Sequence, residues 1–156
     1  MKKLFKSKQS EEILEFLHET VVLLAANKFE EALKPISDSL YTPQILKYTP
    51  RKLKEGIGNY FNDGIDRFVT DPQEASDMHP RQRASLEHDD DETVNVVHPK
   101  YPFCVCWAKE NEQWEPLYAR ADLPLNGNWG DRLTLKFNFE SRPGGFAIVI
   151  EDIEVM

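Results

Sequence analysis

The chain has 156 residues, of which 40% are hydrophobic and 11% aromatic, a composition typical of a folded protein rather than of a disordered chain. Its 19 lysines and arginines against 27 aspartates and glutamates give a formal net charge of −8. This balance argues against nucleic-acid binding, which needs clustered cations, and it is compatible with a basic protein partner. The length predicts a single domain over residues 1–156.

The N-terminus and the two cysteines predict the compartment. Residues 1–9 form a basic tail without the apolar stretch of about 7–15 residues that a secretory signal needs. The longest apolar stretch, residues 20–26, is too short to cross a bilayer. Cys104 and Cys106 are too close on a strand for a favourable disulfide, so we expect reduced core thiols. We therefore expect a cytoplasmic protein of bacterial type with no membrane contact.

The first third of the chain predicts helices. Ser10, followed by two glutamates, is expected to cap an amphipathic helix that ends near Asn27. A short second helix is expected over residues 29–36. Two further cap signals with proline in the first turn are Thr42-Pro43 and Thr49-Pro50.

The middle of the chain predicts irregular structure. Residues 65–69 are expected to form a short strand. Residues 71–99 contain three prolines and an acidic run, and they predict a long acidic surface connection. Within it, residues 93–97 are expected to form a second short strand.

The last third predicts an antiparallel meander. Residues 103–108 are apolar on both faces, as in a central strand, and Pro116 in the next strand predicts an edge or a bulge. Residues 133–139 alternate cleanly, whereas the apolar parity switches within residues 146–155, which predicts a β-bulge near Glu151-Asp152. The expected class is α+β, with N-terminal helices packed on a curved, mostly antiparallel sheet of about four to five strands.

Two regions carry a resemblance to a known fold family. One is ANKFE at residues 26–30; the other is GDRLTL at residues 130–135 with the closing IEDIEV at residues 150–155. They resemble the helix-break-helix start and the terminal hairpin of the nuclear transport factor two-like superfamily, also called cystatin-like or SnoaL-like. Within it the chain is most similar to small bacterial domains. This superfamily hosts isomerases, dehydratases, transport factors and toxin-immunity proteins, so the resemblance leaves the function open. The acidic segment 71–99 departs from its pattern, which argues against a pocket inherited from its enzymes.

The first candidate site is an acidic surface for a partner. A run of carboxylates is most often a solvated loop, but it can also pair with lysines and arginines of another protein. It lacks the spacing of a calcium-binding loop, and no histidine has metal-ligand spacing, so we expect no metal. The expected partner-binding residues are Glu87, Asp89, Asp90, Asp91, Glu92, Trp129 and Asp131.

The second candidate site is a pocket at the mouth of the sheet. Tyr118, Arg120 and Asp122 would line it, with His98 as a general base. Aromatic, arginine and aspartate side chains are also typical of interface hot spots. The plain alternative is that Trp129 covers the edge of the core while Asp131 caps a turn. No serine or cysteine lies in a nucleophile motif, so we expect no catalytic residue and no cofactor.

Together these features favour a binding function over an enzyme. The sequence predicts a protein-binding module, most concretely an acidic immunity-type inhibitor of a toxin or effector, and part of this prediction comes from the resemblance. The alternative is a small-molecule-binding pocket protein or an isomerase- or dehydratase-like enzyme. A homodimer through an exposed sheet face is compatible with either function.

Overall fold

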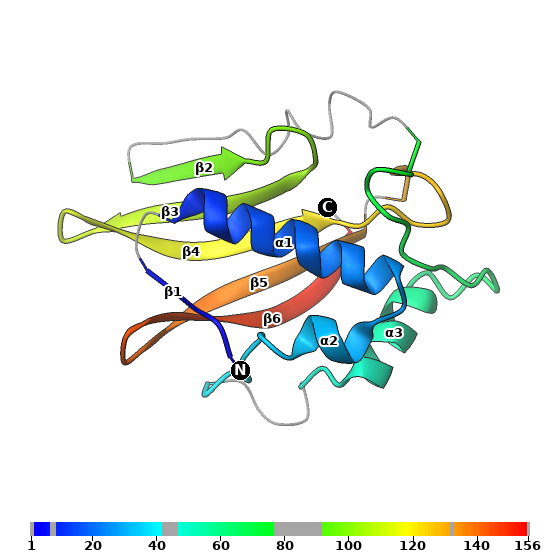
Figure 1. Ribbon diagram of the computed structural model, residues 1–156, viewed down its shortest axis with the longest axis horizontal. Coiled ribbons are helices and arrows are strands. Elements are labelled where there is room, and N and C mark those ends of the chain that lie inside the picture. The colour runs from blue at the N-terminus through cyan, green and yellow to red at the C-terminus, as the bar shows by residue number, and fades with distance from the viewer. Residues whose placement is uncertain (1, 7–8, 42–46, 77–91, 132, 156) are drawn as a thin grey trace.

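The protein is built on one antiparallel sheet with helices on one of its faces (Figure 1). The computed structural model describes residues 2–6, 9–41, 47–76, 92–131 and 133–155. The sheet has six strands in the order β1-β6-β5-β4-β3-β2. They are β1 (Leu4–Phe5), β2 (Thr93–Val97), β3 (Phe103–Glu110), β4 (Gln113–Asp122), β5 (Leu133–Arg142) and β6 (Gly145–Val155). The helices are α1 (Ser10–Ala25), α2 (Phe29–Leu33) and α3 (Pro50–Gly58).

The expected α+β class with a curved antiparallel sheet is confirmed, but the sheet has six strands instead of four to five. Part of the expected basic tail forms the additional strand β1, in which Leu4 pairs with Ala147 and Phe5 with Phe146. The Phe5 side chain is fully buried and packs edge-on against Phe16, at 5.4 Å between ring centroids. Burial of this aromatic ring fixes the tail to the sheet.

Helix α1 lies across the face of the sheet and closes the core (Figure 1). Its buried side chains recur at three- and four-residue spacing, as an amphipathic helix requires; they include Ile13, Leu14, Leu17, Val21 and Leu24. The expected cap at Ser10 is wrong, because Gln9 occupies that position and the Ser10 hydroxyl instead accepts a hydrogen bond from Trp107 Nε1 at 2.7 Å. In the described part of the chain, no helix has the length and apolar character needed to cross a membrane.

Helices α2 and α3 follow the sequence signals. Thr49 caps α3 by accepting a hydrogen bond from the Lys52 backbone amide at 3.1 Å, and Pro50 occupies the first turn. The expected cap at Thr42-Pro43 falls outside the described residues. The expected strand at residues 65–69 is wrong, since only Val69 makes a bridge, to Leu125.

Strand β3 lies between β2 and β4, as its apolar faces predict. Pro116 does not mark an edge, because β4 is itself central. It marks a bulge instead: Cys106 pairs with Tyr118 while Trp107 pairs with Pro116, so Leu117 has no partner opposite it. The extra residue accommodates a proline, which cannot donate a ladder hydrogen bond.

The bulge expected in β6 is confirmed. Lys136 pairs with Asp152 and Phe137 pairs with Ile150, which leaves Glu151 as the extra residue. This shift resets the side-chain parity of the strand, so that Ile148 and Ile153 both join the core.

The sheet has a core face and an opposite face. The face under α1 carries the buried residues Phe103, Val105, Trp107, Ala119, Ala121, Leu135 and Phe137. The two cysteines alternate with these residues, and both are buried thiols rather than disulfide partners. Burial raises the pKa of the Cys104 thiol to about 11, so this thiol is protonated near neutral pH.

Candidate interaction site

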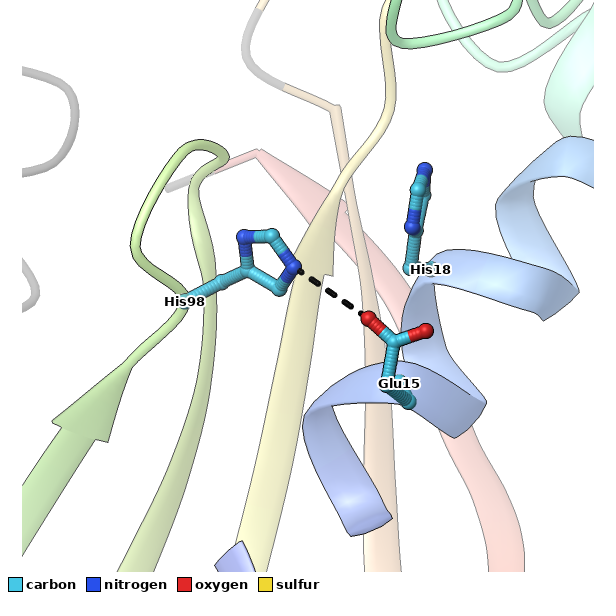
Figure 2. Close-up of side chains that lie close together, drawn as sticks. All are labelled: Glu15, His18 and His98. Atoms are coloured by element: carbon cyan, nitrogen blue, oxygen red, sulfur yellow. Dashed lines mark ion pairs between the residues drawn. The ribbon is translucent and has the colours of Figure 1, made fainter. Parts of the chain in front are cut away.

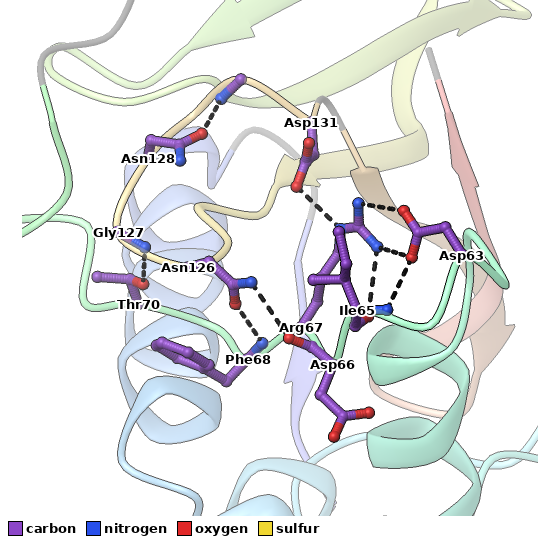
Figure 3. Close-up of polar contacts among 11 residues, drawn as sticks. Asp63, Ile65, Asp66, Arg67, Phe68, Thr70, Asn126, Gly127, Asn128 and Asp131 are labelled. Carbon is purple, nitrogen blue, oxygen red and sulfur yellow. Dashed lines mark hydrogen bonds and ion pairs between the residues drawn. The ribbon is translucent and has the colours of Figure 1, made fainter.

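Two loops from distant parts of the sequence lie side by side at one end of the sheet (Figure 3). One is residues 63–70, which follow α3; the other is residues 124–131, which connect β4 to β5. We call these two segments the loop pair.

Asn126 holds the first loop of the pair by three hydrogen bonds. Its Oδ1 accepts from the Phe68 backbone amide at 2.9 Å, its Nδ2 donates to the Asp66 carbonyl at 3.1 Å, and its own amide donates to the Phe68 carbonyl at 3.0 Å. Asn126 has a φ of 50°, a left-handed conformation that asparagine tolerates better than most residues. The side-chain amide therefore supplies the hydrogen bonds that the backbone of a neighbouring strand would otherwise supply.

A second contact lies at the end of the first loop. The Thr70 hydroxyl accepts a hydrogen bond from the Gly127 amide at 2.8 Å, and the Thr70 amide donates to the Pro124 carbonyl at 2.8 Å. The two segments of the loop pair are thus tied together on either side of Phe68 and Val69.

Arg67 joins the loop pair through its guanidinium (Figure 3). Nη1 and Nη2 donate to the two carboxylate oxygens of Asp63, each at 2.9 Å, and Nε donates to Asp131 Oδ2 at 3.1 Å. The guanidinium also lies over the Phe61 ring, 4.2 Å from its centroid. Only 10% of the Arg67 side chain is exposed, so this charged fork is largely covered by its partners.

These contacts set the charge state of Asp63. Hydrogen bonds from Arg67, and then from the Ile65 amide, lower the pKa of the Asp63 carboxyl to about 2. The same pairing raises the pKa of Arg67. The ion pair is therefore intact over the whole physiological pH range.

Two large apolar side chains project from the loop that these contacts fix. Ile65 is 56% exposed and Phe68 is 64% exposed. Isolated exposed apolar residues are common on proteins. Here both belong to the four-residue segment 65–68, whose backbone is hydrogen-bonded along most of its length. The backbone that carries the two side chains is therefore ordered.

The residues expected to bind a partner are placed unequally. Asp131 belongs to the loop pair, whereas Trp129 is buried in the core near Tyr101 and Phe103, which matches the plain alternative for this tryptophan. Glu92 is exposed beside β2, and its carbonyl accepts from the Lys109 amide at 2.8 Å. The remaining expected residues lie outside the described part of the chain: Glu87, Asp89, Asp90 and Asp91.

Three of the four residues expected to form a pocket lie on one face of the sheet, and His98 lies on the other. Tyr118, Arg120 and Asp122 alternate with core residues on β4, so they lie on the sheet face turned away from α1. Arg120 donates to the Tyr118 hydroxyl at 2.5 Å, and Asp122 accepts from the Thr134 hydroxyl at 2.7 Å. Burial raises the pKa of Tyr118. His98 lies on the α1 side of the sheet, near His18.

His98 instead forms a group with Glu15 and His18 of α1 (Figure 2). One ligand atom of each residue lies within 4.8 Å of the others, and His98 Nε2 is 3.9 Å from Glu15 Oε1. This group was not predicted from the sequence, although the Glu-x-x-His spacing of Glu15 and His18 places both on one side of a helix. Residue types of this kind bind zinc in other proteins.

The hydrogen bonds of His98 argue against metal binding. Its Nδ1 accepts from the backbone amides of Lys100 at 3.0 Å and Tyr101 at 3.3 Å, so the proton of the neutral ring lies on Nε2. A metal-binding histidine donates its other ring N–H to an acceptor. Coordination through Nε2 would place a proton on Nδ1 against two backbone N–H groups. The geometry instead suits a histidine that stabilises the turn between β2 and β3.

A shallow hollow lies beside the start of α1. Ser10, Val94, Trp107 and Trp114 line it, and its volume is about 180 Å³. Pockets that enclose small ligands usually measure about 300–1,000 Å³. The hollow is too small and too open to enclose a metabolite.

A scan against protein-family models and searches of curated proteins and of solved structures find no match for this chain. The resemblance to the nuclear transport factor two-like superfamily therefore stays a prediction.

Proposed function

We propose that the chain is a protein-binding module and, more concretely, an immunity-type inhibitor that covers a basic toxin or effector. The observation that carries this proposal is the display of Ile65 and Phe68 on the hydrogen-bonded loop pair. A loop that is already ordered loses little conformational entropy on association. Aromatic side chains on such supports are typical binding hot spots.

The charge of the chain supports a basic partner. The formal net charge is −8, and an acidic protein attracts a cationic one over distances of about one Debye length, roughly 8 Å at physiological salt. Charge complementarity of this kind accelerates association and suppresses wrong partners. An inhibitor needs such a surface and no catalytic group.

The alternative function, a small-molecule-binding protein or enzyme, has weaker support. The four residues expected to line its pocket lie on both sides of the sheet. The hollow near α1 is below the usual volume of a ligand site.

The test is affinity capture from native cell lysate at low and high salt, followed by mass spectrometry. The baits are the wild-type chain, Phe68→Ser and, as a matched control, Leu117→Ser. Leu117 is 48% exposed on the bulge of β4, away from the loop pair. We expect one basic protein on the wild-type and Leu117→Ser baits, and its loss from Phe68→Ser and at high salt.

A second arm tests inhibition. The captured protein is expressed alone and together with the chain, and growth or the activity of the captured protein is measured. Growth arrest that co-expression of the wild type relieves supports the inhibitor proposal. A specific partner whose activity the chain leaves unchanged would refute inhibition while leaving protein binding in place. No specific partner at either salt concentration would refute both.

A further inference from the structure

We propose that the loop pair recognises an aliphatic or aromatic side chain flanked by lysine or arginine on the partner, with Phe68 as the apolar anchor and Asp66 as the cation acceptor. This inference rests on the proposed protein-binding function. It assigns the contact surface to the loop pair and names the chemistry of its occupant.

The backbone of Phe68 is already engaged within the chain. Its amide and carbonyl are both bonded to Asn126, at 2.9 and 3.0 Å. A partner therefore cannot dock here by adding a strand, because that mode needs free backbone donors and acceptors. What remains available is the side chain, which is 64% exposed. Recognition must be through packing on the ring.

The carboxylates around Phe68 differ in whether they are already paired. Asp63 and Asp131 are both engaged by Arg67, at 2.9 and 3.1 Å. The Asp66 carboxylate is exposed, and it makes no hydrogen bond or ion pair with the described residues. In Figure 3 it points away from the loop pair. Asp66 is two residues from Phe68 in the sequence, so the same loop carries both an unused negative charge and the apolar anchor.

The net charge around the anchor is negative. The first loop and its partner Asp131 contain three carboxylates and one guanidinium, a net charge of −2. Farther along the same stretch, Glu74 is exposed and makes no ion pair with the described residues. Such a surface repels an acidic segment and attracts a lysine or arginine. An apolar residue with a basic neighbour satisfies both the ring and the carboxylate.

The alternation of roles along the first loop supports this assignment. Ile65 and Phe68 are exposed, whereas Arg67 and Val69 are covered. Arg67 thus stabilises the loop through its ion pairs, while Ile65 and Phe68 face the solvent. Its low exposure means that the guanidinium is not available to bind an anionic partner.

The experiment selects ligands before the partner is identified. A random peptide library displayed on phage is panned against the immobilised full chain. Enriched peptides are then synthesised, and their binding to the wild type and variants is measured by fluorescence anisotropy at two salt concentrations. The variants are Phe68→Ser and Asp66→Asn; the matched controls are Leu117→Ser and Glu110→Gln, at exposed positions on strands. Circular dichroism checks that each variant is folded.

We expect enriched peptides that combine an aliphatic or aromatic residue with lysine or arginine. Phe68→Ser should weaken their binding about tenfold or more, as expected for a hot-spot residue. Asp66→Asn should weaken it about two- to fivefold and flatten its salt dependence, since a charge at the rim acts mainly on association. Both controls should bind like the wild type.

Three results would overturn the inference: no enrichment, enriched peptides without basic residues, or equal binding by Phe68→Ser. These results can be distinguished from a failure of the proposed protein-binding function. A partner that the wild type captures from lysate, and that Phe68→Ser captures equally well, leaves the binding function standing and removes the loop pair as its surface.

Discussion

Replacing Phe137 by alanine tests the assignment of the core most directly. Phe137 is fully buried in the middle of β5, where it pairs with Ala119 of β4 and Ile150 of β6. Loss of the ring removes about 1.5–3 kcal/mol of burial free energy. Ala119 is too small to fill the space across the ladder, so a cavity remains and raises the total to about 3–5 kcal/mol.

The matched control is Phe68→Ala, which makes the same chemical change at a side chain that is 64% exposed. We expect a change of no more than about 0.5 kcal/mol there, as for most surface substitutions. Chemical denaturation followed by circular dichroism measures both. For a chain of this size, the core substitution should also lower the melting temperature by roughly 6–20 °C. A loss below about 1 kcal/mol for Phe137→Ala, or equal losses for the two variants, would refute the assignment of β5.

The Asp63 carboxyl and the group of Glu15, His18 and His98 give two further predictions. The Asp63 carboxyl should titrate by NMR with a midpoint of about 2, and Arg67→Gln should move it toward about 4, the ordinary value. Because the folded pKa is lowered, this carboxylate contributes stability above the unfolded pKa of about 4, and the contribution is lost as the pH falls through the folded value; a wild-type midpoint near 4 would contradict the Arg67 contact. Addition of zinc should leave the melting temperature unchanged, because His98 Nδ1 accepts two backbone hydrogen bonds. A zinc-dependent rise that His18→Ala abolishes would show that the ring can change its tautomer.

Much of the sheet could be predicted because the alternation of apolar residues reports directly on a two-sided strand. The parity switch within β6 even predicted the bulge near Glu151-Asp152, where the structure has Glu151 as the extra residue. Strand β1 escaped prediction because two residues, Leu4 and Phe5, are too few to show a period. Pro116 illustrates an ambiguity of a different kind, since an edge and a bulge both remove the need for its missing N–H.

The candidate site was much harder to predict than the sheet. Arg67 and Asp131 are 64 residues apart, and nothing in either local pattern indicates their partner. The same holds for His98, whose contact with α1 depends on how the helix crosses the sheet. Sequence patterns specify elements well, but contacts between loops depend on where the register of the sheet places the ends of its strands.

Residues 65–69 form a loop instead of the expected strand, and the reason bears on the proposed binding surface. Ile65, Phe68 and Val69 give it the apolar content of a strand, and in a strand Ile65 and Val69 would share one face. Hydrogen bonds with the Asn126 side chain and between Arg67 and its carboxylates fix the segment as a loop. In this loop Val69 is buried and Phe68 is exposed. Leaving about two thirds of this ring in water forgoes roughly 1–2 kcal/mol of burial free energy. Several specific hydrogen bonds thus maintain a conformation that the hydrophobic effect alone disfavours, as expected of a surface that acquires its apolar contact from a partner.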